Sequence, residues 1–281
     1  MNCEVRVAVI MSVYLMDKLE YVKQAVLSIE MQSLPCDFYV MADGPITKEI
    51  NDYFKTLTQR SRTINSFSVY YYTRKENRGL AFSLNQLIEH VLESQNNYSY
   101  IARMDADDIS LPNRIQSQVN YLDSNKSVDV LGTGCIEFSS TRSDIYLKVL
   151  PVEDHILKRD IIRRCPFIHP SVMFRKSLFL KGFRYPTDTK STEDYAFWVI
   201  LAIAGYKFGN IDEALIKFRF EDDVLLRRRG FKKANSEFIA RWQAMKQLNC
   251  MSIKNILFAL GIWALRVAPT SLAQFAYKKL R

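Results

Sequence analysis

Three aspartates, Asp105, Asp107 and Asp108, stand close together near the middle of the 281-residue chain. They follow an apolar stretch, residues 98–104, whose composition predicts a buried strand. Residues two apart in an extended chain point to the same side, so Asp105 and Asp107 can converge on one point. Carboxylates this close repel each other unless a cation lies between them, and their oxygen atoms suit Mg²⁺ or Mn²⁺. A solvated acidic turn capping the helix after Pro112 would have the same spacing, so both interpretations stay open.

The first third of the chain alternates apolar and amphipathic stretches. The predicted order is strand, helix, strand, helix, strand, over residues 5–14, 17–31, 38–41, 48–57 and 67–72. The first helix is expected to begin at Asp17, with Glu20 three residues on in a capping-box arrangement. This order predicts a parallel sheet with crossover helices, and such sheets bind ligands beyond the carboxyl ends of their strands. Tyr14, Asp43 and the three aspartates all follow predicted strands, so we expect them to share one cleft.

Gly79 precedes an apolar stripe at helical spacing over residues 80–92, so it lies at the N-terminus of a predicted helix. Helix N-termini attract anions, and glycine lets a ligand approach the backbone closely. A lone glycine is explained equally well as an ordinary residue at the boundary between a loop and a helix.

The rest of the chain carries a second set of candidate side chains. The further predicted helices are 110–122, 154–164, 192–205, 235–248 and 253–268, and the strands are 128–131, 137–138, 146–149 and one ending near 174. Glu193 and Asp194 fall in the first turn of a helix, where carboxylates either complement the helix dipole or serve as a general base. His169 lies in a polar turn and either lines a cleft or hydrogen-bonds to backbone.

The last sixty residues differ in character from the rest. A basic run, Arg227 to Arg229, precedes two predicted helices, and a basic tail occupies residues 278–281. The basic run either closes over a diphosphate or faces anionic lipid. The apolar helix of residues 253–268 is too short to span a bilayer but suits an interfacial helix on an anionic membrane. Packing of this helix on the preceding domain is the alternative.

The net charge of +9 favours an anionic partner, and about half of the residues (48%) are apolar, so the chain can bury a core. Nucleic acid is not expected as that partner, because no basic-aromatic recognition module is visible. The five cysteines are scattered without metal-binding spacing, which favours a reducing cytoplasm. The N-terminal apolar run lacks a basic leader and is interpreted as a strand.

Six short motifs, in this order, resemble glycosyltransferase family 2, whose members have the GT-A fold. The motifs are Val9-Ile10-Met11-Ser12-Val13-Tyr14, Ala42-Asp43-Gly44, Asn77-Arg78-Gly79-Leu80 with Asn85, Arg103-Met104-Asp105-Ala106-Asp107-Asp108, His169-Pro170-Ser171 and Glu193-Asp194-Tyr195. The resemblance covers nearly the whole chain and is greatest to the amylovoran and O-antigen branch, whose enzymes build bacterial surface polysaccharide. The chain departs from the family at Ser12-Val13-Tyr14-Leu15, where Pro-Thr-Tyr-Asn is frequent.

On the donor side, the resemblance implies inverting transfer of a hexose from a UDP-sugar, with Mn²⁺ or Mg²⁺ as cofactor. Tyr14 would stack on the uracil and Asp43 would bond its edge, with Asn77 and Arg78 also on the donor side.

The resemblance also implies roles around the diphosphate and the acceptor. Asp105 would hold the ribose or a metal-bound water, and Asp107 would ligate the ion that bridges the diphosphate. Asp194 would be the general base. The acceptor or diphosphate side would include Glu193, His169, Arg227 and Arg228.

We therefore expect an α/β protein with the GT-A fold: a Rossmann-like, mostly parallel central sheet flanked by helices, with a C-terminal helical extension. The catalytic domain would span residues 1–218, with a nucleotide-binding half (1–109) and an acceptor half (110–218). A basic, amphipathic extension would occupy residues 219–281.

The expected reaction adds one hexose to a saccharide on polyprenyl diphosphate, at the inner face of the cell membrane. A sugar-phosphate nucleotidyltransferase is one alternative, but it needs a glycine-rich basic loop, which residues 12–16 do not supply. A non-catalytic, membrane-associated nucleotide-sugar binder is the other, and the intact acidic pairs argue against it.

Overall fold

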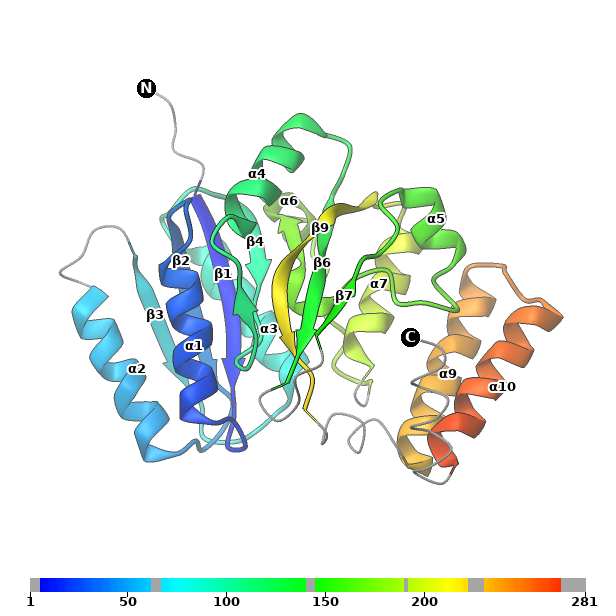
Figure 1. The fold of residues 1–281 in the computed structure, drawn as a ribbon, viewed down its shortest axis with the longest axis horizontal. Helices are drawn as coiled ribbons and strands as arrows, with labels where there is room; N and C mark the ends of the chain where they lie inside the picture. Colours follow the sequence, from blue (N-terminus) through cyan, green and yellow to red (C-terminus); the bar gives the residue numbers. More distant parts are fainter. Residues whose placement is uncertain (1–5, 62–66, 140–144, 190–191, 222–229, 269–281) are drawn as a thin grey trace.

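The computed structural model describes residues 6–61, 67–139, 145–189, 192–221 and 230–268; this part of the chain forms a mixed nine-stranded sheet with helices on both faces (Figure 1). The strands are β1 (Arg6–Val13), β2 (Cys36–Ala42), β3 (Val69–Thr73), β4 (Tyr98–Arg103), β5 (Ile109–Ser110), β6 (Val130–Phe138), β7 (Tyr146–Lys148), β8 (Met173–Arg175) and β9 (Phe208–Arg219). The helices are α1 (Leu19–Glu30), α2 (Lys48–Ser61), α3 (Leu80–Glu93), α4 (Arg114–Ser124), α5 (Asp154–Arg159), α6 (Lys176–Leu180), α7 (Glu193–Ile203), α9 (Phe231–Gln247) and α10 (Ile253–Val267), with a 3-10 turn at His169–Ser171.

The strand order is β3-β2-β1-β4-β8-β6-β9-β5, with β7 paired to β6. The first four strands run parallel, as predicted, so the carboxyl ends of β1, β2 and β4 meet at one edge. Strand β8 is antiparallel to β4 and to β6, which gives the second half of the sheet a mixed character. The predicted α/β fold with helices at the C-terminus is confirmed.

Strand β1 shows why a continuous apolar run becomes a central strand. Ala8 and Ile10 face one hydrophobic core, together with residues of α3 and α7. Val7, Val9 and Met11 face the other core, together with α1 and α2. Because successive side chains alternate between two buried faces, the run from Val7 to Met11 in the middle of the strand is apolar throughout.

The structure corrects three of the local predictions. Asp17 does not cap a helix, because its carboxylate accepts a hydrogen bond of 2.8 Å from the Tyr14 N–H and α1 begins at Leu19. Ser110 lies in the short strand β5, and the helix after it begins at Arg114. The predicted helix 154–164 ends as an α-helix at Arg159. In each case a tertiary contact or a turn replaces the local helical preference.

The C-terminal helices form a hairpin, α9–α10, with α10 on the outer side of α9 (Figure 1). Trp263 on α10 donates a hydrogen bond of 2.7 Å to Asn235 on α9, and Ala244, Met245 and Ala259 join the core shared with α3 and α7. The inner face of the hairpin therefore packs on the domain. In the part of the chain that the structure describes, no helix is both long enough and apolar enough to cross a membrane.

Candidate active site

A cleft of about 720 Å³ opens beyond the carboxyl end of β4. It brings together five residues that the sequence singles out from distant positions. These residues are Arg78, Asp105, His169, Glu193 and Asp194. Both predicted halves of the catalytic domain thus face one hollow.

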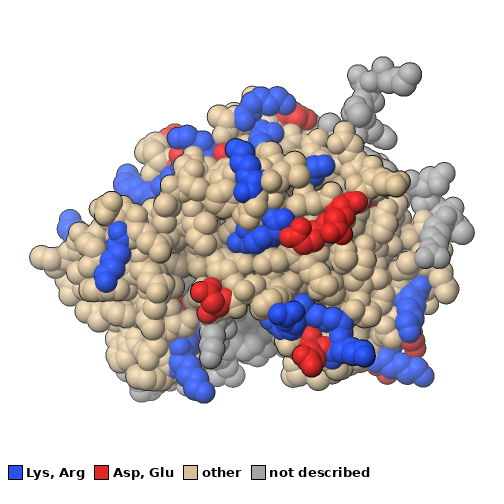
Figure 2. Space-filling model, turned by 180° about the vertical axis from the view of Figure 1, so that it is seen from behind, with Lys and Arg blue, Asp and Glu red and all other residues tan. Residues whose placement is uncertain are grey.

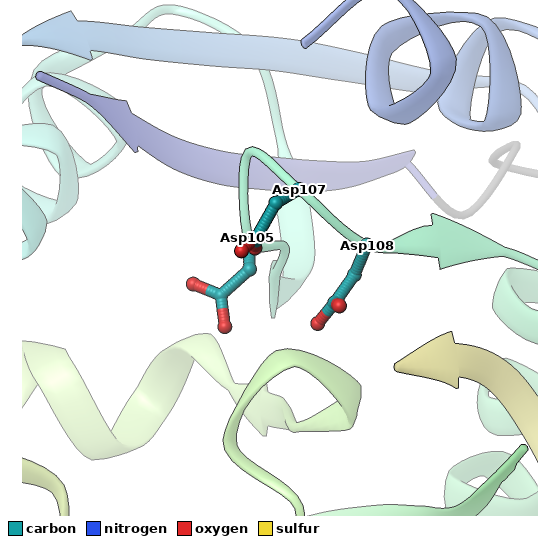
Figure 3. Close-up of side chains that lie close together, drawn as sticks. All are labelled: Asp105, Asp107 and Asp108. Atoms are coloured by element: carbon teal, nitrogen blue, oxygen red, sulfur yellow. The ribbon is translucent and has the colours of Figure 1, made fainter. Parts of the chain in front are cut away.

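The acidic turn, Asp105 to Asp108, connects β4 to β5 at this cleft. Figure 3 shows the carboxylates of Asp105, Asp107 and Asp108 on the same side of the turn, and one carboxylate oxygen of each lies within 4.8 Å of the others. Arg103, the last residue of β4, is buried and forms an ion pair with Asp105. The convergence expected from the spacing of Asp105 and Asp107 is present, and Asp108 joins it.

Asp108 provides the observation that tests whether a cation fits here. Its side chain is 1% exposed, and its Oδ2 atom has no hydrogen-bond partner among the described residues. Burial, followed by the negative charges of Asp107 and Asp105, raises the pKa of Asp108 well above its usual range. An unpartnered buried oxygen beside two further carboxylates matches the hard-oxygen environment that Mg²⁺ or Mn²⁺ requires. The three residues therefore fit a divalent ion.

Asp43 lies at the end of β2, and protein donors already engage its carboxylate. Oδ1 accepts hydrogen bonds of 2.9 Å from Arg74 Nε and 2.8 Å from the Arg78 N–H, while Oδ2 accepts one of 2.9 Å from the Gly79 N–H. Asp43 thus holds the loop before α3 in place. Oδ2, which accepts from the Gly79 N–H, keeps lone-pair capacity for a ligand N–H.

The other donor-side residues lie around this loop. The Asn77 side chain donates to the Asp43 carbonyl at 3.1 Å, and the exposed Arg78 guanidinium stacks over Phe82 at 4.0 Å from the ring centroid. Tyr14 follows β1, and its side chain is 36% exposed. Of the residues expected to share one cleft, Asp105 lines it, whereas Tyr14, Asp43, Asp107 and Asp108, like Asn77, are not among the described residues of its lining. The contacts of Tyr14, Asp43 and Asn77 with a base, and of Asp107 with an ion, remain a prediction.

Glu193 and Asp194 lie in the first turn of α7, and both side chains line the cleft. Asp194 Oδ1 accepts a hydrogen bond of 2.7 Å from the Tyr195 N–H, so the helix terminus orients this carboxylate. Burial and the neighbouring charge of Asp194 raise the pKa of Glu193. The two carboxylates therefore complement the dipole of α7 and are also accessible from the cleft.

His169 lies in the 3-10 turn between α5 and β8 and lines the cleft. Its Nε2 atom is 3.2 Å from the hydroxyl oxygen of Tyr185. Burial and the nearby Arg103 guanidinium hold the pKa of His169 well below its usual range. A neutral imidazole in this position exchanges hydrogen bonds without adding positive charge to the cleft.

Several residues of the site carry no distinctive sequence signal. The side-chain amide of Asn85 donates a hydrogen bond to the Tyr185 carbonyl and accepts one from the Tyr185 N–H, each at 2.8 Å. These two bonds tie the loop before α7 to α3. Lys233 lines the cleft from α9. The predicted Arg227 and Arg228 lie outside the described residues.

The mixed sheet is that of the GT-A fold, and Asp105 of the acidic turn shares one cleft with the carboxylate pair of α7. Residues 8–183 match the family model described as Glycosyl transferase family 2, and the chain belongs to this family.

Relatives of similar length support this assignment. The amylovoran biosynthesis glycosyltransferase AmsE of Erwinia amylovora is 29% identical over 277 residues, which cover 98% of each chain. The Escherichia coli UDP-Gal:alpha-D-GlcNAc-diphosphoundecaprenol beta-1,3-galactosyltransferase is 29% identical over 279 residues, covering 97% of this chain and 95% of that protein.

A solved structure shows the same fold. The mannosyltransferase PcManGT from Pyrobaculum calidifontis, in complex with GDP-Man and Mn²⁺, has a TM-score of 0.61 at 15% identity, covering 99% of this chain and 80% of that one.

Proposed function

We propose that this glycosyltransferase transfers a hexose from a UDP-sugar, with inversion, to a saccharide carried on polyprenyl diphosphate during assembly of bacterial surface polysaccharide. The observation that carries the proposal is that Asp105 of the acidic turn and Asp194 of α7 line one cleft. The name of the Escherichia coli relative, with a UDP-Gal donor and a diphosphoundecaprenol acceptor, supports the choice of both substrates.

The donor side of the proposal uses the edge formed by β1, β2 and β4. The uracil stacks on the exposed ring of Tyr14 and bonds the Asp43 carboxylate, while Asn77 and Arg78 contact the donor from the loop before α3. Asp107 would hold a divalent ion, Asp105 would bond the ribose or a water on that ion, and the unpartnered Oδ2 of Asp108 would complete the oxygen cluster. When bound, the ion offsets negative charge on the departing diphosphate.

The acceptor side of the proposal uses Asp194 as general base. An alcohol is a poor nucleophile, so a carboxylate within hydrogen-bond reach takes its proton as the oxygen attacks the anomeric carbon. The bond from that carbon to the UDP oxygen breaks, and UDP leaves with the electron pair. Attack from the opposite side inverts the configuration, so an α-linked donor gives a β-linked product. Glu193 and His169 line the same part of the cleft and contact the acceptor.

We place the reaction at the inner face of the cell membrane, with α10 in contact with an anionic surface. Ile253, Leu257 and Leu260 share the outward side of α10 and are 78%, 63% and 45% exposed, respectively. Figure 2 shows this end of the molecule, at the left, with isolated basic side chains on a largely uncharged surface. An apolar stripe flanked by basic residues suits the lipid–water boundary.

The test incubates the purified protein with a panel of UDP-sugars and a synthetic lipid-diphosphate saccharide, with and without Mn²⁺. We expect release of UDP and a β-linked product with one UDP-sugar, and little turnover without a divalent ion. Turnover that is unaffected by complete metal chelation would contradict the role of the acidic turn. A product with retained configuration would contradict the role of Asp194.

A further inference from the structure

The part of the cleft next to the α9–α10 hairpin is lined by basic side chains from separate elements. We call this set the hairpin cations: Lys148 at the end of β7, Arg164 after α5, Lys233 and Arg241 on α9, and Arg266 on α10. None of these elements supplies the acidic turn, at which we place the diphosphate of the donor.

The five hairpin cations face four carboxylates that also line the cleft: Glu137, Glu193, Asp194 and Glu237. Lys148 pairs with Glu137 at 3.6 Å, and Lys233 and Arg266 both pair with Glu237, at 4.0 and 3.1 Å. Arg241 Nε is buried and has no hydrogen-bond partner among the described residues. Arg164 is exposed, and its guanidinium donates a hydrogen bond of 3.0 Å to the backbone carbonyl of Val149. This region of the cleft is therefore prepared for an anion with several oxygen acceptors.

Lys233 connects the hairpin cations to the candidate base. Burial lowers the pKa of Lys233, while the negative charges of Glu237, Asp194 and Glu193 oppose that shift. Lys233 and Asp194 both line the cleft. An additional anion beside Lys233 would offset the cost of keeping this charge buried.

We infer that the hairpin cations bind the diphosphate of the lipid-linked acceptor and so place its sugar hydroxyl at Asp194. The inference rests on the proposed function, and it assigns the C-terminal hairpin a role in acceptor selection. A sugar attached to diphosphate holds its hydroxyls about one ring away from the phosphates. Binding the diphosphate beside Lys233 therefore presents the sugar to the neighbouring carboxylate. Arginine and lysine in a partly desolvated cleft distinguish such a dianion from a neutral glycoside.

The kinetic test compares two acceptors with the same sugar and alkyl chain, one linked through diphosphate and one through a simple glycosidic bond. We expect Lys233→Ala and Arg164→Ala each to raise KM for the diphosphate acceptor at least tenfold. KM for the glycoside and for the UDP-sugar should stay the same. The matched controls are Lys232→Ala and Arg163→Ala, which remove exposed neighbouring charges that do not line the cleft. Equal losses with both acceptors, or a raised KM for the donor, would overturn the inference.

A binding measurement separates this inference from the transferase assignment. Titration calorimetry with farnesyl diphosphate should show saturable binding to the wild type and to Lys232→Ala. Binding should be at least fivefold weaker to Lys233→Ala and to Arg164→Ala, the latter at an exposed position. Excess UDP should leave the binding in place. Displacement by UDP, or unchanged affinity in both variants, would overturn the inference. Absence of turnover with every UDP-sugar, with this binding intact, would instead contradict the proposed function.

Discussion

The carboxylate of Asp108 accepts a hydrogen bond of 2.7 Å from the backbone N–H of Arg219, which is 111 residues further along the chain. Arg219 in turn donates to the Asp107 carbonyl at 2.8 Å and to Gln24 at 2.6 Å. Its guanidinium lies 3.8 Å from the ring centroid of Tyr21. The acidic turn is therefore clamped between α1 and the end of β9, which fixes the direction of its carboxylates.

Asp108→Ala should lower the free energy of unfolding by about 1–3 kcal/mol, because it leaves the buried Arg219 N–H without an acceptor. Asp108→Asn keeps an acceptor oxygen and removes a buried charge beside Asp105 and Asp107. We expect the Asn variant to be at least as stable as the wild type in urea unfolding at pH 7.5 with a chelator. An Asn variant as unstable as the Ala variant would show that the negative charge, not the hydrogen bond, supports the turn.

Sequence patterns predicted the elements that are built from local, repetitive signals. Strands β1, β2 and β4 were predictable because their apolar runs are buried on both faces, and the motif residues fell at their ends. The half-buried β3 was predictable from its run of aromatic residues. Strand β9 was missed, since polar residues such as Asn210, Asp212 and Glu213 interrupt its apolar pattern. Asn210 is nevertheless fully buried, and its amide donates to the Pro151 carbonyl at 2.8 Å, a contact between distant segments.

Some residues of the candidate site could likewise be predicted from the sequence, and others could not. Asp105, His169 and Asp194 reached the cleft as their motifs implied. The buried position of Arg103 and the approach of Lys233 from α9 depend on tertiary packing, which no local spacing encodes. The hydrogen bonds that the Asp43 carboxylate accepts from Arg74 and from the loop before α3 were likewise not predictable from the sequence.

Asp194→Asn should lower kcat about 10²–10⁴-fold, because the amide cannot take the proton of the acceptor hydroxyl. KM for the UDP-sugar should change little, since Asp194 faces the acceptor. Steady-state kinetics with UDP release as the readout measures both parameters. Asp52→Asn, at an exposed position on α2, is the matched control and should behave as the wild type. If the Asp194→Asn variant keeps the full kcat, Asp194 is not the general base.

Stability should depend on His169 below neutral pH. Burial and Arg103 hold the pKa of His169 low in the folded state, while the unfolded chain has a histidine pKa of about 6.5. The unfolded state therefore binds more protons below about pH 6.5, and folded stability falls as the pH decreases through that value. One proton gives a slope of at most about 1.4 kcal/mol per pH unit.

The variant His169→Gln should have a smaller loss of stability between pH 7.5 and 5.5 than the wild type, measured from urea midpoints. His155→Gln, which removes a histidine whose side chain is 70% exposed, should keep the wild-type pH dependence. If stability falls equally with pH in the wild type, His169→Gln and His155→Gln, His169 is not buried in its neutral form.

Gly44→Ala should destabilise the protein and weaken binding of the UDP-sugar. Gly44 has φ of +82°, and a Cβ atom there would lie 2.5 Å from the Asn77 backbone nitrogen. We expect a loss of more than about 1 kcal/mol in unfolding free energy, with a higher KM for the donor because the loop held by Asp43 must shift. Gly261→Ala, in α10 with open space around its Cβ position, should instead stabilise the protein by about 0.5–1 kcal/mol. Equal effects at both positions would contradict the crowding at Gly44.

Leu257→Glu should weaken attachment to anionic vesicles, because it places a charge in the exposed apolar stripe of α10. Burying a leucine side chain in lipid is worth about 1.5–3 kcal/mol, so co-sedimentation with phosphatidylglycerol vesicles should weaken at least tenfold. Leu27→Glu, at a similarly exposed apolar position on α1, is the control and should leave vesicle binding unchanged apart from its charge. Because α10 packs on the domain through its opposite face, the Leu257→Glu enzyme should keep its activity toward a short-chain, water-soluble acceptor. Equal vesicle binding by both variants would place the membrane contact elsewhere on the molecule.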